Sequence, residues 1–145
     1  MKIAIGSDHG GYSLKEIIKE HLQSQGHELL DVGTHSLDSV DFPDYSAQVC
    51  QKLDVQEAEL GILICGTGIG MSIAANKHKG IRAALVHDVY SAKMTRAHNN
   101  SNVLCMGARV IGDELAKMIV DTWLSTDFEG GRHQRRLDKL EGESC

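Results

Sequence analysis

Short apolar runs alternate with helix-length segments along the chain, and this alternation constrains the fold more than any other feature. The run at residues 59–65, ELGILIC, is nearly continuous in apolar residues, as is typical of a parallel strand buried on both faces. Helix-length segments between such strands require right-handed crossovers and a sheet that is covered on both sides. We therefore predict an α/β fold: a single-domain, doubly wound (Rossmann or flavodoxin-like) five-stranded parallel sheet with helices on both faces.

The same pattern gives approximate bounds for the elements. The first helix shows apolar residues at helical spacing, Leu14, Ile17, Ile18 and Leu22, and Gly26 is its stop signal. A flavodoxin-like strand order of 2-1-3-4-5 is the expected arrangement. Strands are predicted over 2–7, 27–33, 59–65, 81–87 and 102–107, and helices over 12–26, 43–53, 70–79, 89–99 and 113–124, with a short surface helix in the polar remainder.

Length and charge exclude several classes of protein. The 145 residues suffice for one well-cored domain, spanning 1–145, and the net charge of −5 argues against binding to nucleic acid or to an anionic membrane surface. No apolar stretch is long enough to span a bilayer, and the start MKIAIGSDHGG turns polar too soon for a signal peptide, so we expect a cytoplasmic protein. The four cysteines, Cys50, Cys65, Cys105 and Cys145, lack CxxC spacing and are expected to be thiols, with neither a disulfide framework nor a zinc site.

Two polar, glycine-rich loops are expected to meet at one edge of the sheet. In doubly wound sheets, ligands bind beyond the carboxyl ends of the strands where the strand order reverses. Here that point lies between the first and third strands, which end in SDHGG (residues 7–11) and CGTGIG (residues 65–70). The predicted topology therefore brings Asp8, His9, Cys65 and Thr67 into one cleft.

The glycine loop after Cys65 allows more than one interpretation. As a dinucleotide-binding fingerprint it has Gly66 and Gly68 in place, but Met71 occupies the third glycine position; Asp88 could still serve as the ribose-binding carboxylate, so this interpretation stays open. No Gly-Lys-Ser/Thr follows, so it is not a Walker loop. As an anion-binding turn, it would point consecutive N–H groups inward at a helix start and favour the thiolate form of the cysteine beside it. A buried, purely structural cysteine is the competing explanation.

Basic and amide side chains further along the chain indicate a phosphorylated ligand. His98 and Asn99 lie at a predicted helix end, where a histidine often only caps the helix, and Arg109 follows the fifth strand. Arg132 and Arg136 are four residues apart and so share one helix face, either as a solvated charged face or as a bidentate phosphate clamp. Together these residues suggest a small sugar-phosphate-like substrate, a group that acts as acid or base near neutral pH, and an oxyanion site.

Four motifs carry a resemblance to a known family. SDHGG, CGTGIGMSIAANK, HNNSNVL and EGGRHQRR occur in this order across nearly the whole chain. With them the chain resembles the type B ribose-5-phosphate isomerases, a family that also includes the galactose-6-phosphate isomerase subunits. The resemblance implies a cofactor-free and metal-free aldose–ketose isomerase of the pentose phosphate pathway. It also implies a homodimer, or a tetramer, in which active sites are shared between subunits.

The resemblance also implies roles for individual residues. Cys65 would be the base that moves a proton between C1 and C2 through an enediolate, with Thr67 supporting the thiolate, and His98 with Asp8 would open the furanose ring. The segment 126–145 would fold over the active site or over the dimer partner, and His98, Asn99 and Arg109 would come from the second subunit. The remaining substrate-binding positions are His9, Gly66, Gly68, Ile69, Gly70, Asn99, Arg109, Arg132 and Arg136, in addition to Asp8 and Thr67.

The implied reaction interconverts ribose 5-phosphate and ribulose 5-phosphate. A six-carbon substrate, allose 6-phosphate or galactose 6-phosphate, is the alternative within the family, because pocket depth is not readable from sequence. A non-catalytic sugar-phosphate sensor is disfavoured, since a sensor would need a phosphate clamp but no base. The expected partners are the sugar phosphate and a second copy of the chain, with neither nucleic acid nor membrane.

Overall fold

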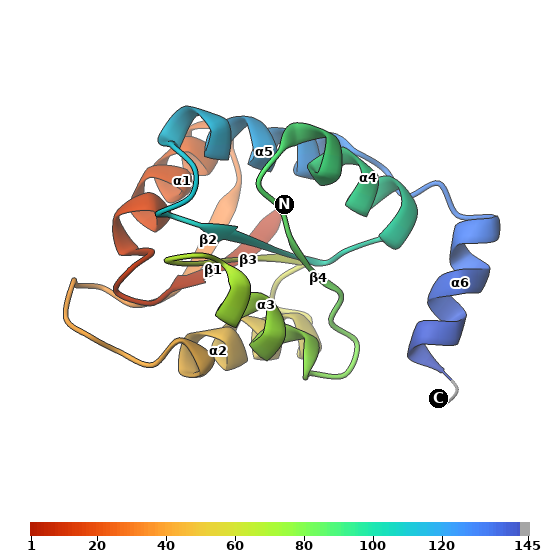
Figure 1. The fold of residues 1–145 in the computed structure, drawn as a ribbon, viewed down its shortest axis with the longest axis horizontal. Helices are drawn as coiled ribbons and strands as arrows, with labels where there is room; N and C mark the ends of the chain where they lie inside the picture. The colour runs from red at the N-terminus through yellow and green to blue at the C-terminus, as the bar shows by residue number, and fades with distance from the viewer. Residues whose placement is uncertain (143–145) are drawn as a thin grey trace.

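The computed structural model describes residues 1–142, which form five strands and six helices (Figure 1). The prediction for the segment 126–145 therefore falls partly outside the described residues, as does Cys145. The strands are β1 Lys2–Ser7, β2 Glu28–Gly33, β3 Leu60–Cys65, β4 Ala83–Leu85 and β5 Val103–Gly107. The helices are α1 Tyr12–Ser24, α2 Phe42–Asp54, α3 Ile69–Asn76, α4 Val89–Asn99, α5 Asp113–Ser125 and α6 Arg132–Glu141.

The sheet is parallel throughout and has the order β2-β1-β3-β5-β4. The predicted fold class is confirmed, but the predicted order 2-1-3-4-5 is wrong for its last two strands. β5 is buried along its whole length and takes the interior place beside β3, while the three-residue β4 is only partly buried and forms the edge. A fully apolar strand gains more from the doubly covered interior of the sheet, which accounts for the exchange.

Alternate side chains of the strands enter two separate cores, one on each face of the sheet. Figure 1 shows α1, α4 and α5 covering one face and α2 and α3 the other. Ile62 and Ile64 of β3 join the first core, which is closed by the fully buried Trp123 of α5. Leu63 and Cys65 face the second core, beneath α2 and α3. The side chain of Cys65 thus lies on the α2–α3 side, at the end of the central strand.

The register of the central strands places three loops at one edge. Ser7 of β1 pairs with Ile64 of β3, and Cys65 pairs with Gly107 of β5. The loops that follow β1, β3 and β5 therefore leave the sheet side by side. The predicted meeting of the loops at residues 7–11 and 65–70 is confirmed, and the start of the loop after β5 joins them.

The last helix, α6, stands away from the sheet beside the end of α4 (Figure 1). It buries His133 and Leu137, four residues apart, and its other side chains are largely exposed. Arg82, just before β4, forms an ion pair of 2.9 Å with Glu141 at the far end of the helix. No helix within residues 1–142 is long and apolar enough to cross a bilayer.

Candidate functional site

Cys65 ends β3 with its thiol held against the glycine loop. The side chain is buried, with 5% of the residue exposed, and its Sγ accepts a hydrogen bond from the backbone N–H of Gly68 at 3.2 Å. Helix α3 begins at the next residue, so this N–H lies at the positive end of a helix. Burial raises the pKa of Cys50 to about 11 and also raises that of Cys105, which keeps these two core cysteines protonated. Cys65 differs from them in facing a loop of backbone donors.

Gly68 gives the loop its shape. It adopts φ 78°, and a Cβ at this position would lie 2.6 Å from Leu85 Cδ1 and 2.8 Å from the carbonyl carbon of Met106. A side chain is therefore excluded both by the left-handed backbone and by lack of space. The neighbouring Thr67 is exposed, and its Oγ1 accepts a hydrogen bond from the N–H of Ile69 at 3.3 Å. The turn thus presents backbone rather than side chains to the space in front of the thiol.

Asp8 and His9 lie in the loop after β1. Asp8 Oδ1 accepts hydrogen bonds from the N–H groups of Gly10 and Gly11 at 2.9 and 3.1 Å. His9 Nδ1 accepts the N–H of Val40 at 3.1 Å, so in the neutral imidazole the proton is on Nε2. The loop thus holds a carboxylate beside β3 and a histidine whose free nitrogen is a donor.

Arg109 reaches back over both loops of its own chain. Its N–H donates to Gly66 O at 3.0 Å, and a Cβ on Gly66 would lie 3.0 Å from Arg109 Nη1. A Cβ on Gly10 would lie 3.5 Å from Arg109 Nη2. The expected grouping of Arg109 with His98 and Asn99 is therefore wrong within this chain, because the turn after β5 anchors Arg109 beside Cys65.

His87 is a neighbour of this site that sequence reasoning missed. Its Nε2 accepts the N–H of Gly107 at 2.9 Å, and a Cβ on Gly107 would lie 2.6 Å from the carbonyl carbon of Thr67. His87 thus fixes the strand end on which the glycine loop packs. In the sequence, His87 is only the last residue of the strand predicted over 81–87, and a histidine at such a place is too common to indicate a site.

His98 and Asn99 lie at the amino ends of the strands, whereas Cys65 lies at the carboxyl ends. They end α4, just before β5 begins at Val103, whereas Cys65 pairs with the last residue of β5. The distance along β5 from Val103 to Gly107 is about 13 Å, at roughly 3.3 Å per residue. The exposed Arg132 and Arg136 are on α6, which packs on this same end of α4. One chain therefore does not bring these four residues to Cys65.

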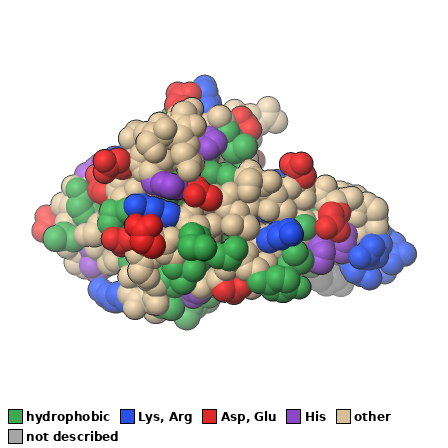
Figure 2. Space-filling model, turned by 90° about the horizontal axis from the view of Figure 1, so that it is seen from above, with side chains coloured by type: hydrophobic (Ala, Val, Ile, Leu, Met, Phe, Trp, Pro, Cys, Tyr) green, Lys and Arg blue, Asp and Glu red, His purple; other side chains and the backbone are tan. Residues whose placement is uncertain are grey.

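His98 contacts two residues, His133 and Glu129, that the sequence analysis did not predict as site residues. The rings of His98 and His133 stack with centroids 4.2 Å apart and planes 12° apart, and Glu129 Oε1 faces both rings. Burial, together with the positive charges nearby, lowers the pKa of His133. Figure 2 shows histidine, acidic and basic side chains gathered at this end of the molecule. Glu129 and His133 both belong to the EGGRHQRR motif, but their contact with His98 arises only from the packing of α6 on α4.

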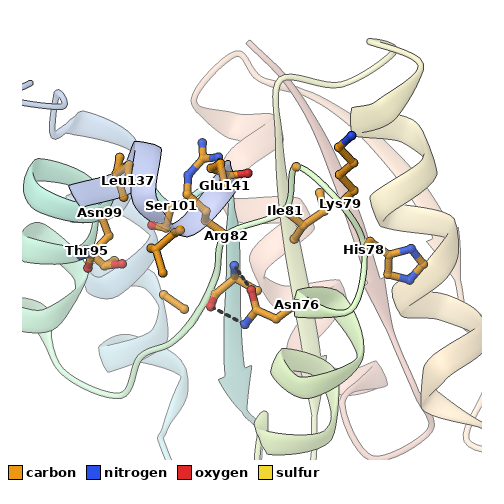
Figure 3. Close-up of a pocket in the computed structure, with 14 residues that line it drawn as sticks. Asn76, His78, Lys79, Ile81, Arg82, Thr95, Asn99, Ser101, Leu137 and Glu141 are labelled. Atoms are coloured by element: carbon orange, nitrogen blue, oxygen red, sulfur yellow. Dashed lines mark hydrogen bonds and ion pairs between the residues drawn. The ribbon is translucent and has the colours of Figure 1, made fainter. Parts of the chain in front are cut away.

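A cavity of about 500 Å³ opens at this same end (Figure 3), and Cys65 is not among the residues that line it. It lies between the end of α3, β4, the end of α4 and α6, and its lining includes Asn99, Arg82 and Leu137. Asn76 fixes one wall through hydrogen bonds of 2.9 Å to both backbone polar groups of Ala83.

The geometry at the carboxyl edge defines a class of site. A thiol, a helix N-terminus, Arg109 and the His9 Nε2–H converge where a parallel α/β sheet binds ligands, and each group other than the thiol attracts an anion. The protein is thus an α/β protein with a buried cysteine and anion-attracting groups at the carboxyl ends of its strands. The chain belongs to the Ribose/Galactose Isomerase family, whose sequence model matches residues 3–140.

Individual relatives agree with this assignment over almost their full length. The chain is 52% identical to the Ribose-5-phosphate isomerase B of Escherichia coli (strain K12), with 96% of this chain and 93% of that protein covered. The solved structure of Clostridium thermocellum Ribose-5-Phosphate Isomerase B matches with a TM-score of 0.96 and 52% identity over 97% of this chain and 95% of that one. The Mycoplasma genitalium Ribose-5-phosphate Isomerase B with bound Ribulose-5-phosphate matches with a TM-score of 0.92 and 47% identity over 96% and 93%.

Proposed function

We propose that this chain interconverts ribose 5-phosphate and ribulose 5-phosphate, with Cys65 as the base. Support comes from the 52% identical Ribose-5-phosphate isomerase B and from the structural neighbour that holds ribulose 5-phosphate. The observation in this chain that carries the proposal is the Cys65 thiol, 3.2 Å from the Gly68 N–H, at the ligand-binding edge of the sheet.

The reaction moves one proton between neighbouring carbons. Starting from the open-chain aldose, the Cys65 thiolate removes the proton from C2 and negative charge develops on O1 of the enediolate. A proton then moves from O2 to O1, and the Cys65 thiol returns its proton to C1, which leaves the carbonyl at C2. The N–H groups of residues 66–70 would stabilise this charge, and a comparable preorganised donor is worth roughly 3 kcal/mol of barrier. Because glycine occupies most of this loop, the sugar carbons can approach the thiol.

The residues that would bind the substrate lie in two groups within one chain, one at the carboxyl ends of the strands and one at their amino ends. On the Cys65 side, Arg109 and the His9 Nε2–H would bind the phosphate; Arg109 lies against Gly66 and Gly10, and Val40 N–H occupies the His9 Nδ1. Arg132 and Arg136 would complete the clamp, and His98 and Asn99 would act on the furanose ring with Asp8. We propose that these four come from a second copy of the chain, because within one chain they lie at the amino ends of the strands.

A homodimer with shared sites follows from this division. The exposed edge strand β4 supports such an interface, because large apolar side chains are exposed on it and on both neighbouring helices. They are Ile69 and Ile73 of α3, Leu85 of β4 and Tyr90 of α4. The segment 126–142 would then reach over the partner's site through α6. We also propose a cytoplasmic location, where reducing conditions keep Cys65 a free thiol.

A substrate comparison tests the proposed reaction. The purified protein is assayed with ribose 5-phosphate, allose 6-phosphate and galactose 6-phosphate, with Cys65→Ala as the control for a contaminating isomerase. The proposal expects the highest kcat/KM for ribose 5-phosphate. A higher value for a six-carbon sugar would assign the substrate differently, and binding without turnover of any of the three would indicate a sensor.

A further inference from the structure

Three potential ligand atoms converge where α6 meets α4. Glu129 Oε1 lies 3.8 Å from His98 Nε2 and 3.4 Å from His133 Nε2, and the three atoms lie within 4.8 Å of one another. The main chain of Glu129 is anchored to α4, because its N–H donates to Ala97 O at 3.0 Å. Residues from α4, α6 and the segment before α6 thus bring three potential ligand atoms close together.

The buried member of this cluster lacks a hydrogen bond. His133 is only 6% exposed, and within residues 1–142 its Nε2 has no hydrogen-bond partner. The distance of 3.4 Å between Glu129 Oε1 and His133 Nε2 is too long for a normal hydrogen bond. An unpaired buried ring nitrogen costs free energy, which a cation among the three atoms would recover.

We propose that His98, Glu129 and His133 form a binding site for a divalent transition-metal ion, with Zn²⁺ as the best fit. Two imidazole nitrogens and one carboxylate oxygen are ligands that Zn²⁺ binds in tetrahedral sites, with the fourth position open to water. The stacked rings cannot both direct a lone pair at one ion, so the His98 ring turns about its Cβ–Cγ bond on binding. Its 39% exposed side chain has room to do so, while the buried His133 is the fixed ligand.

Occupancy of this site would regulate the enzyme. If His98 opens the sugar ring, as the proposed function states, a metal ion on its Nε2 removes that group and inhibits turnover of the cyclic substrate. This consequence rests on the proposed function. Binding of the metal ion itself does not.

Direct titration with Zn²⁺ tests the site. Chelator-treated Cys65→Ala protein, which lacks the competing active-site thiol, is titrated with Zn²⁺ by calorimetry, and Co²⁺ absorption reports the ligands. We expect one equivalent per chain and a tetrahedral Co²⁺ spectrum without a thiolate charge-transfer band. Glu129→Gln and His133→Asn on this background should each weaken binding more than about tenfold.

The exposed His78, in the turn after α3, provides a matched control, and His78→Asn should bind as the Cys65→Ala parent does. Glu129 is exposed, so its variant tests the site even if His133→Asn does not fold. Unchanged affinity in Glu129→Gln, or no saturable binding to the parent, overturns the metal site. Stoichiometric Zn²⁺ binding by the wild-type protein without inhibition upholds the site and contradicts the ring-opening role of His98.

Discussion

Cys65 lies at the carboxyl ends of the parallel strands, and His98 lies at their amino ends. Cys65 pairs with Gly107 at the end of β5, whereas His98 precedes the first residue of that strand. A proton-transfer base and a ring-opening group must reach the same sugar, which is a few ångströms across. If both act in one reaction, they must come from different chains.

The role of Cys65 predicts a selective loss of activity. Cys65→Ala removes the base, so kcat should fall by about 10²–10⁴-fold. Stability should change by only about 1 kcal/mol, because a small side chain at a strand end is lost. Steady-state kinetics and urea unfolding measure the two effects. The matched control is Cys50→Ala, in α2, and a near-normal kcat in Cys65→Ala would remove the thiol from the mechanism.

Gly68 should be irreplaceable for two reasons at once. Gly68→Ala would place a Cβ 2.6 Å from Leu85 Cδ1 on a backbone with φ 78°, and it should reduce both kcat and stability, the latter by about 2–4 kcal/mol. Gly80→Ala is the control, since Gly80 has φ 81° but nothing within 4 Å of a Cβ. It should cost only about 1–2 kcal/mol and leave kcat unchanged. Equal effects of the two variants on kcat would mean that the loop shape is not what matters.

The arginines of α6 should act on phosphate binding. Arg132→Ala and Arg136→Ala should each raise KM, with binding weakened by about 1.5–3 kcal/mol for a lost charge-assisted contact. Inorganic phosphate should also inhibit these variants less than the parent. Arg135 points in a different direction on the helix, so Arg135→Ala is the internal control. If it weakens phosphate inhibition equally, the effect is general electrostatics and the clamp is wrong.

An ion pair between α1 and β2 that includes a fully buried lysine predicts acid sensitivity. Lys15 is fully buried and contacts Asp31 at 2.7 Å, and Lys19 contacts the same carboxylate at 2.9 Å. Burial alone would raise the pKa of Asp31, but the hydrogen bonds from Lys15 and Lys19 outweigh it and lower the pKa. The pair's stabilisation is therefore present above the unfolded pKa of about 3.9 and is lost as pH falls through the lower folded value.

Asp31→Asn should lower the free energy of unfolding at pH 7 by about 3 kcal/mol, because it leaves the buried Lys15 ammonium without its closest partner, with only Glu16 remaining at 3.6 Å. Urea unfolding at pH 7 and at low pH checks this. The loss should shrink in acid, where the wild-type carboxylate is also protonated. The exposed Asp54, at the end of α2, supplies the control variant Asp54→Asn, which should change stability by less than about 0.5 kcal/mol. A pH-independent loss in Asp31→Asn would contradict the ion-pair explanation.

Local patterns in the sequence predicted the elements well, because periodicity and end signals act within a few residues. The helix predicted over 89–99 agrees with α4, and the meeting of the loops at 7–11 and 65–70 follows from parallel pairing. The order of β4 and β5 depends on which strand is better buried in the assembled sheet, and no short segment encodes that comparison. The placement of Arg109 on Gly66, and the contact of His98 with His133, likewise arise between segments far apart in sequence.

Mixing two inactive variants tests the shared site most directly. Cys65→Ala and His98→Asn are each purified, unfolded together in equal amounts and refolded, so that statistical pairing makes half of the dimers mixed. Each mixed dimer would hold one intact site, with Cys65 from one chain and His98 from the other, so ribose 5-phosphate isomerisation should recover to about one quarter of the wild-type level. If the mixture is no more active than the separate variants while refolded wild type regains its activity, the two residues do not form one site across the dimer.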